Sequence, residues 1–132
     1  MIFLDTNYIN GLILKRDSHN AFSKNIRPFL AKEAKATNIT VLVEVLNSLK
    51  VNNFNGNFDA IIDKLVNLDV FDYLSVEDYQ KAMELCKFYN FSMNFSDCTI
   101  LVSMEKHRIN KIVTNDSDFD KIKGIRRIGG FS

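Results

Sequence analysis

The sequence lacks the features that mark several large classes of protein. No apolar stretch in its 132 residues approaches the ~20 residues needed to span a bilayer. The N-terminus has no basic segment followed by a long apolar run, so we expect no signal peptide. These absences favour a cytoplasmic protein that makes no use of a membrane.

Cysteine and glycine are also scarce. The two cysteines, Cys86 and Cys98, match no zinc-binding spacing and are too few for a disulfide framework. We interpret both as reduced residues in or near the core. The five glycines form no phosphate-binding loop, which argues against nucleoside triphosphate chemistry.

Charge of one sign does not dominate. Seventeen basic residues face sixteen acidic ones, for a net charge of +1, which excludes a polycationic wrapper of nucleic acid. A nuclease stays open, because an acidic metal site would cancel a basic substrate track in the total. The chain is 46% hydrophobic and 25% charged, which is typical of a globular protein, and its length predicts a single domain over residues 1–132.

Short apolar strands alternate with amphipathic helices along the chain. This alternation predicts an α/β fold of three layers, with helices on both faces of a central, mostly parallel sheet of four to five strands. Pro28, the only proline, should kink or divide the second helix. We expect strands at residues 1–4, 36–39, 70–74, 111–114 and 126–128, and helices at 8–14, 21–34, 41–50, 58–68, 76–89 and 97–107.

Polar residues precede three of these helices. Thr40, Ser75 and Ser96 are therefore predicted to cap the helices that follow them. Asp78, three residues after Ser75, would complete a capping box.

Acidic residues follow two of the expected strands. Asp5 ends the first apolar run, and Asp116 follows the strand at 111–114. Because ligands of open α/β sheets collect outside the carboxyl ends of the strands, an acid at that edge is placed for chemistry. Asp97 opens a helix and shares a face with Ile100 and Leu101, so it should point inward. Glu44 borders the apolar stripe of its own helix.

Each acid also has a simpler interpretation. Asp97 alone would favour the helix dipole, Asp116 and Asp118 would be ordinary turn residues, and Glu44 would be a solvated helix acid. Asp5 is the hardest to explain in this way, because a strand end seldom needs a carboxylate. The hypothesis of a site therefore depends on the whole set.

Such a set would need a cation. Two carboxylates ~4 Å apart repel by about 4 kcal/mol at an effective dielectric of ~20. Ligands that are all oxygen favour Mg²⁺ or Mn²⁺ over Zn²⁺. A hard divalent ion lowers the pKa of a bound water and holds a phosphate oxygen, which matches phosphodiester hydrolysis.

The chain resembles PIN-domain ribonucleases, and among these the single-domain toxins of the VapC type. The resemblance covers essentially the whole chain and implies a Mg²⁺- or Mn²⁺-dependent endoribonuclease acting on RNA. It further implies a homodimer and an antitoxin-like inhibitor protein made alongside it. The resemblance is carried by Glu44 and by residues 3–7 (FLDTN), 96–101 (SDCTIL) and 112–119 (IVTNDSDF).

The resemblance also suggests roles for individual residues. Asp5, Glu44 and Asp97 match the first three family acids, and Asp116 matches the fourth by its distance from Thr114. Asp118 would share or replace the role of Asp116 as a metal ligand, so the choice between these two stays open.

Two hydroxyl residues match family positions next to the acids. Thr6 and Thr114 resemble groups that hold acids or water. A helix cap and a strand-end residue are equally good interpretations of them.

Basic residues cluster after the third and fourth acids. Lys106, Arg108, Lys121 and Lys123 would contact RNA phosphates through salt-dependent attraction. The alternative is that they are solvated helix ends or protect an edge strand.

Two other functions remain in competition. One is a PIN-like module that binds RNA or protein without catalysis. The other is a phosphatase that forms an aspartyl-phosphate, which is disfavoured because Asn7 stands where that chemistry usually has a second Asp.

Overall fold

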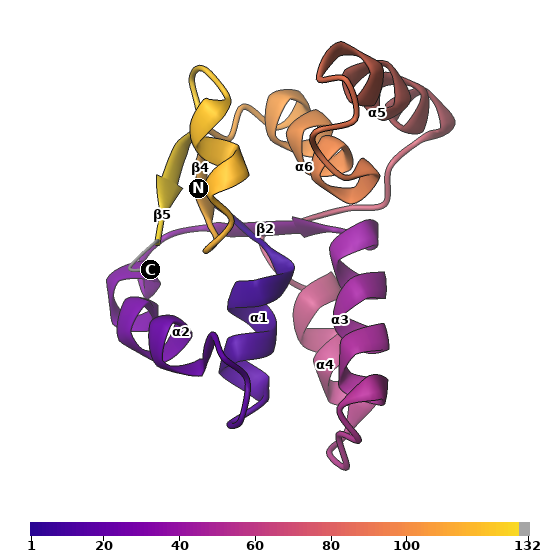
Figure 1. The fold of residues 1–132 in the computed structure, drawn as a ribbon. Helices are drawn as coiled ribbons and strands as arrows, with labels where there is room; N and C mark the ends of the chain where they lie inside the picture. Colours follow the sequence, from indigo (N-terminus) through magenta and orange to yellow (C-terminus); the bar gives the residue numbers. More distant parts are fainter. Residues whose placement is uncertain (130–132) are drawn as a thin grey trace.

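The architecture is a central sheet covered by helices, as seen in a computed structural model that describes residues 1–129 (Figure 1). Its strands within these residues are β1 (Ile2–Leu4), β2 (Lys35–Asn38), β3 (Val70–Asp72), β4 (Lys111–Val113) and β5 (Arg126–Ile128). The α-helices are α1 (Thr6–Ile13), α2 (Asn20–Ile26), α3 (Ile39–Val51), α4 (Phe58–Val66), α5 (Val76–Phe88) and α6 (Phe95–Lys106). Two 3-10 helices, η1 (Arg27–Leu30) and η2 (Ser117–Lys121), complete the described chain.

The five strands form one parallel sheet in the order β3-β2-β1-β4-β5. The chain moves outward from β1 to β2 and β3, and then returns across the sheet to β4 and β5. Parallel crossovers are right-handed, so this reversal places the later helices on the opposite face from the earlier ones. The expected parallel α/β sheet is thereby confirmed.

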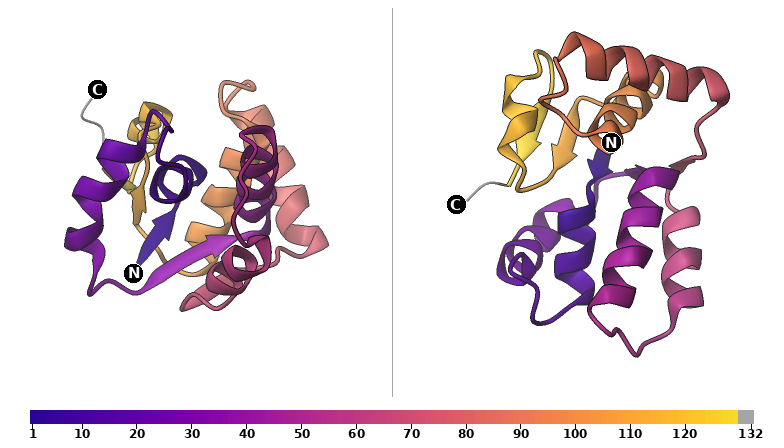
Figure 2. Two further views of the ribbon diagram at one scale, coloured as in Figure 1. Left: turned by 90° about the horizontal axis from the view of Figure 1, so that it is seen from below. Right: turned by 45° about the vertical axis from the view of Figure 1, so that its right-hand side comes forward.

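The helices form two separate layers. Helices α1 to α4 lie together on one side of the sheet, and α5 and α6 lie on the other (Figures 1 and 2). Helix α6 is sandwiched between the sheet and α5, so every residue from Asp97 to Met104 is buried. Strand β1 is buried on both faces, and Ile2, Phe3 and Leu4 form the centre of the core.

Helices α1 and α2 approach each other closely at Gly11. A side chain at Gly11 would lie 2.2 Å from Ser23 Oγ and 2.6 Å from the carbonyl oxygen of His19. The Ser23 hydroxyl donates a hydrogen bond to the carbonyl oxygen of Tyr8 at 2.8 Å. Glycine at this position therefore sets the distance between the two helices.

Two helix boundaries confirm the sequence predictions. Ser75 caps α5 and forms a capping box with Asp78. Pro28 divides the second helix, because α2 ends at Ile26 and Pro28 lies in the first turn of η1.

Two predicted caps are wrong. Asn38 caps α3, since its side chain accepts a hydrogen bond from the backbone N–H of Val41. The hydroxyl of Thr40, the predicted cap, instead donates to Asn38 Oδ1 at 2.8 Å. Helix α6 begins one residue after Asn94, so Ser96 lies inside the helix.

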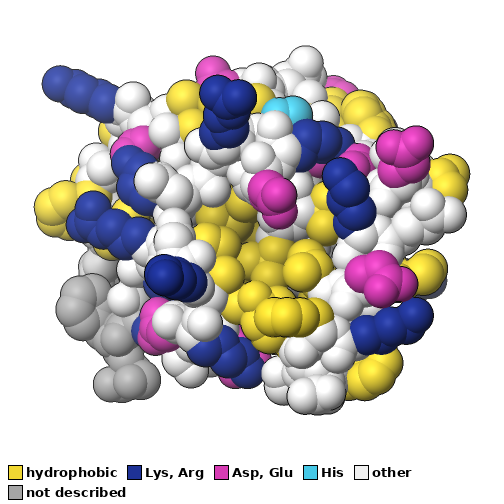
Figure 3. Space-filling view, turned by 90° about the horizontal axis from the view of Figure 1, so that it is seen from above, with side chains coloured by type: hydrophobic (Ala, Val, Ile, Leu, Met, Phe, Trp, Pro, Cys, Tyr) yellow, Lys and Arg dark blue, Asp and Glu magenta, His cyan; other side chains and the backbone are white. Residues whose placement is uncertain are grey.

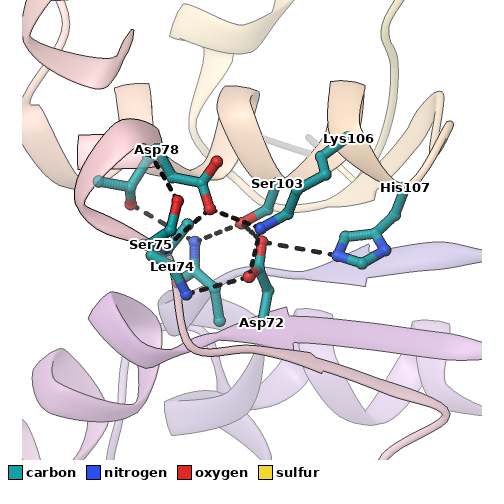
Figure 4. A network of polar contacts seen from close by, with 9 residues as sticks. Asp72, Leu74, Ser75, Asp78, Ser103, Lys106 and His107 are labelled. Carbon is teal, nitrogen blue, oxygen red and sulfur yellow. Dashed lines mark hydrogen bonds and ion pairs between the residues drawn. The ribbon is translucent and has the colours of Figure 1, made fainter. Parts of the chain in front are cut away.

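A network of polar groups joins α6 to β3 and α5 (Figure 4). The Lys106 ammonium donates to Asp72 Oδ1 at 2.7 Å and to Asp78 Oδ2 at 2.6 Å. The Ser103 hydroxyl donates to Asp72 Oδ2 at 2.8 Å. Burial alone would raise the pKa of Asp72, but hydrogen bonds from Lys106, Leu74 and Ser103 outweigh it and lower the pKa.

No helix within residues 1–129 is both long and apolar enough to cross a membrane.

The network predicts a measurable loss of stability in the variant Asp72→Asn. The free energy of unfolding at pH 7 should fall by about 1–2 kcal/mol, less than for a fully buried pair because Lys106 is partly exposed. Since the pKa of Asp72 is lowered, this difference should shrink as the pH falls below the ordinary value of 3.8. Urea unfolding measures it.

The matched control is Glu84→Gln, which removes an exposed pair with Lys87 and should leave stability unchanged. Equal stabilities of Asp72→Asn and the original protein would contradict a structural role for the network.

Candidate active site

The site lies where the order of the strands in the sheet reverses, between β1 and β4. Leu4, the last residue of β1, is paired with Val113, the last residue of β4. Strand β1 has β2 on its other side, so the chain leaves β1 and β4 toward opposite faces of the sheet. Such a topological switch point is where open α/β sheets bind ligands.

Asp5 occupies the end of β1 and is only 6% exposed. Its carboxylate accepts hydrogen bonds from the backbone N–H of Thr6 and from the Thr114 hydroxyl, both at 2.7 Å. Burial raises the pKa of Asp5 to about 6, and the charges of Glu44 and Asp116 add to the rise against these hydrogen bonds. The carboxylate therefore belongs to a cluster of acids.

Asp97 reaches the same cluster from the first turn of α6. It is 7% exposed, which confirms that it points inward. Burial is the main reason that the pKa of Asp97 rises to about 7, and the charges of Asp5, Asp116 and Glu44 contribute in that order.

Glu44 and Asp116 complete the group from α3 and from the segment after β4. Glu44 is the most exposed of the four, yet partial burial raises its pKa against a lowering hydrogen bond with Ser96. Asp116 is half-buried, caps η2 and accepts a hydrogen bond from the backbone N–H of Asp118 at 2.9 Å. The structure thus brings together the four acids predicted from the sequence.

The Thr114 hydroxyl connects the two strand ends. It donates to Asp5 Oδ2 and accepts from the Asn7 side-chain amide at 2.9 Å and from the backbone N–H of Asp116 at 3.0 Å. The side-chain oxygen of Asn7 accepts from the backbone N–H of Asn115 at 3.1 Å. Thr114 therefore lies where a residue that orients Asp5 is expected.

Thr6 has a different environment from Thr114. Its hydroxyl oxygen is buried, and no group within residues 1–129 forms a hydrogen bond with it. A buried hydroxyl without a protein partner is costly unless another ligand satisfies it. Its position directly after Asp5 fits a site that takes such a ligand.

Asp118 lies at the margin of the cluster. Its carboxylate is 3.7 Å from the Lys121 ammonium, and its side chain is 49% exposed. It is not among the main charges that raise the pKa of Asp5 or Asp97. This placement favours Asp116 as the fourth acid.

The predicted basic residues are separated by the fold. Lys106 lies nine residues after Asp97 on the same helix, about 13 Å along its axis, and is bonded to Asp72 and Asp78. Arg108, Lys121 and Lys123 are exposed. This geometry favours a structural role for Lys106 and leaves the other three accessible to a substrate.

Two residues contact groups of the site although the sequence analysis gave them no role there. Asn7 bridges Thr114 and Asn115, and Ser96 forms a hydrogen bond with Glu44. In the sequence, the position of Asn7 two residues after Asp5 could have indicated its role in the site. The position of Ser96 directly before Asp97 could have done the same.

The donor set fits a hard divalent cation. All four groups are carboxylates, and the repulsion between them is the kind that Mg²⁺ or Mn²⁺ relieves. No group of three or more His, Cys, Asp or Glu side chains within residues 1–129 has the spacing of a complete metal site. The acids thus form a loose cluster, and ion binding would require their side chains to close in.

Comparison with known proteins identifies the family. A family model described as PIN domain matches residues 2–125. The chain belongs to the PIN domain family. Among curated proteins, Ribonuclease VapC6 of Methanocaldococcus jannaschii is 25% identical over 148 residues, covering 96% of this chain and 95% of that protein.

Solved structures confirm the PIN fold. VapC20 of Mycobacterium tuberculosis, described as a sarcin-ricin loop cleaving toxin, has a TM-score of 0.77 at 22% identity and covers 98% of this chain and 99% of its own. A toxin–antitoxin complex from Klebsiella pneumoniae has a TM-score of 0.71 at 20% identity over 96% of both chains. VapBC2 from Rickettsia felis, bound to a promoter DNA fragment, has a TM-score of 0.69 at 20% identity over 97% of this chain and 98% of its own.

The raised pKa values predict that the PIN site destabilises the protein when no divalent ion is bound. When an acid has a higher pKa in the folded state than in the unfolded state, the protein loses stability as the pH rises between the two values. For Asp97 this range runs from 3.8 to about 7. In chelator at pH 8, Asp97→Asn should therefore raise the free energy of unfolding by about 2 kcal/mol. At pH 4 the difference should disappear.

Glu105→Gln, an exposed substitution on the same helix, is the control and should change nothing. Added Mn²⁺ should raise the melting temperature of the original protein more than that of Asp97→Asn. A variant less stable than the original protein at pH 8 would argue against charge repulsion at this position.

Proposed function

We propose that this protein is a divalent-metal-dependent endoribonuclease that hydrolyses RNA phosphodiester bonds, and that it is the toxin of a toxin–antitoxin pair. The observation that carries this proposal is the convergence of Asp5, Glu44, Asp97 and Asp116 at the switch point of the sheet. The relatives named ribonuclease and toxin support it.

The residues of the cluster differ in environment, which suggests different roles. Asp5, Asp97 and Asp116 would hold a Mg²⁺ or Mn²⁺ ion. The bound ion would supply a water of lowered pKa and neutralise phosphate charge. Glu44, on the exposed side, would orient water or help to hold a second ion. The Thr114 hydroxyl donates to Asp5 Oδ2 and the backbone N–H of Thr6 donates to Asp5 Oδ1, so these two hydrogen bonds would fix the orientation of the carboxylate toward a ligand.

The face carrying α5 and α6 offers contacts for RNA. Seen from above, Lys and Arg side chains with some acidic ones surround a hollow lined by hydrophobic side chains (Figure 3). Basic groups attract phosphates without regard to sequence, and apolar surfaces accept unpaired bases. Arg108, Lys121 and Lys123 are exposed and would attract RNA phosphates where the strand passes them. The Asp118 carboxylate, 3.7 Å from the Lys121 ammonium, would partly neutralise that lysine.

Loss of a single acid should abolish RNA cleavage. Purified protein with mixed RNAs should cleave in Mn²⁺ or Mg²⁺ and not in chelator. Asp5→Asn and Asp97→Asn keep the side-chain shape but remove a charge, so cleavage should fall at least 100-fold, as is common when a group that acts in the transition state is removed. Gel analysis of the products measures the rate.

Glu105→Gln should cleave at the original rate, because this residue is exposed near the far end of α6. Full activity of Asp5→Asn, or equal activity in chelator, would contradict the assignment.

The two alternatives would give other results. A non-catalytic PIN-like module would bind RNA or protein, with no cleavage under any metal condition. An aspartyl-phosphate phosphatase would trap phosphate on Asp5. The second is further disfavoured because the Asn7 side chain is held by Thr114 and by the backbone N–H of Asn115.

The proposed partners are an antitoxin-like inhibitor protein and a second copy of the chain. Structural neighbours were solved as toxin–antitoxin complexes. A mostly apolar cavity of about 810 Å³ between α1, η1 and α4 would accept apolar side chains of a partner. Residues lining it include Leu12, Ile13, Phe54, Ile61 and Leu68.

An inhibitor would be encoded in the adjacent open reading frame. Co-expressed with that reading frame, the protein should co-purify with its product and cleave RNA at least tenfold more slowly than when purified alone. Separate elution of the two proteins with unchanged cleavage would contradict the toxin–antitoxin proposal and leave the nuclease assignment standing.

A further inference from the structure

The two cysteines form a close pair beside the acidic cluster. Cys86 on α5 and Cys98 on α6 have their Sγ atoms 3.3 Å apart. Both are free thiols, 6% and 0% exposed. Cys98 directly follows Asp97 in the first turn of α6, so the pair joins the outer helix to the element that carries the third acid.

A groove gives small molecules access to one thiol of the pair. It has a volume of about 570 Å³ and lies between α5, the loop at residues 89–94 and the start of α6. Cys86 is one of its lining residues, and Cys98 is not. The groove is also lined by Met83, Phe91 and Phe95.

The loop beside the groove has a constrained shape. Asn90 and Phe91 both have positive φ, at 53° and 59°, and Phe91 is 74% exposed. The backbone N–H of Phe91 donates to the carbonyl oxygen of Cys86 at 2.8 Å. The loop is thus attached to the end of α5 while its aromatic ring stays in solvent.

We propose that Cys86 and Cys98 form a reversible disulfide when the protein meets a peroxide, and that this disulfide inactivates the acidic site. The inactivation rests on the proposed nuclease function, whereas the disulfide does not.

The disulfide would form in two steps, and each step releases one water. The peroxide transfers one oxygen to the Cys86 thiol, giving a sulfenic acid and water. Cys98 Sγ then attacks Cys86 Sγ, the S–O bond breaks, and the hydroxyl leaves with the Cys98 proton as a second water. Thiol reduction of the disulfide restores both cysteines.

The order of the steps follows from access. Cys98 is 0% exposed and does not line the groove, whereas Cys86 does. A thiol that peroxide cannot reach from solution reacts poorly with it, so the first step belongs to Cys86. The second step is intramolecular and needs no access from solvent.

The disulfide would displace the third acid. A disulfide bond is about 2.05 Å long, so sulfurs now 3.3 Å apart must approach by more than 1 Å. Cys98 lies in the first turn of α6, and that turn would move toward α5 and away from β1 and β4. Asp97 would then leave Asp5 and Asp116, and a shift of ~1 Å can lower a rate about 100-fold.

The disulfide itself is tested without any RNA. After hydrogen peroxide treatment and unfolding, thiol titration should detect no free cysteine, and the intact mass should fall by about 2 Da. Dithiothreitol should restore both. Cys86→Ala should not lose this mass. A cysteine that gains oxygen, or two thiols that survive the treatment, would overturn the proposal.

The link to the site is tested by RNA cleavage in Mn²⁺. Oxidised protein should cleave at least tenfold more slowly and recover with dithiothreitol, while Cys86→Ala should cleave equally before and after peroxide. Met83→Leu, which removes an oxidisable sulfur from the groove, should behave like the original protein. A disulfide that forms without changing cleavage would overturn the link.

If the reduced protein cleaves no RNA in any metal ion, the nuclease function fails. The mass and thiol results still decide whether the cysteine pair oxidises as proposed.

Discussion

The burial of acidic side chains beside one another at the switch point is the constraint on which this structure depends. Burial is the main reason that the pKa values of Asp5 and Asp97 are raised, and repulsion between the neighbouring carboxylates adds to it. Natural proteins keep such an arrangement only where its function needs it. The surrounding core must therefore compensate for the free energy of folding that the site costs.

The fold supplies this stability through β1 and α6. Strand β1 is buried on both faces, and its pairing with β4 fixes Asp5 beside Thr114. Helix α6 is held from below by Asn38, whose side-chain amide donates to Thr99 and Ser103, and at its end by Asp72. Asp97 thus lies on a helix that β2 and β3 hold by hydrogen bonds from Thr99 to Lys106.

The close packing of α5 and α6 also links the cysteine pair to the acidic site. Because α5 and α6 pack through Cys86 and Cys98, any bond between them acts directly on the first turn of α6. A site built on rigid elements is sensitive to sub-ångström changes in their position. This sensitivity would turn a small covalent change into a large change in activity.

Local signals in the sequence explain why much of the fold and site was predictable. Asp5 was recognised because a carboxylate rarely ends a buried strand, and Asp97 because its helical spacing from Ile100 and Leu101 places it on the inward face. The alternation of strands and helices likewise predicted the parallel sheet. These arguments use only neighbours in the chain.

The features that the sequence did not predict depend on contacts between distant segments. Thr40 was a reasonable cap by residue type, but Asn38 takes that role and is held in place by Thr99 and Ser103 from α6. The role of Asn7 requires the register between β1 and β4, which brings it to Thr114. Lys106 was grouped with substrate residues because its partners, Asp72 and Asp78, are far away in sequence.

The most direct test of the central claim is anomalous diffraction from crystals of the protein soaked in Mn²⁺. The account predicts a manganese peak between the carboxylates of Asp5 and Asp97, with oxygen ligands at about 2.0–2.3 Å. Manganese found only at surface acids away from Asp5, or no ordered manganese at millimolar concentration, would contradict it.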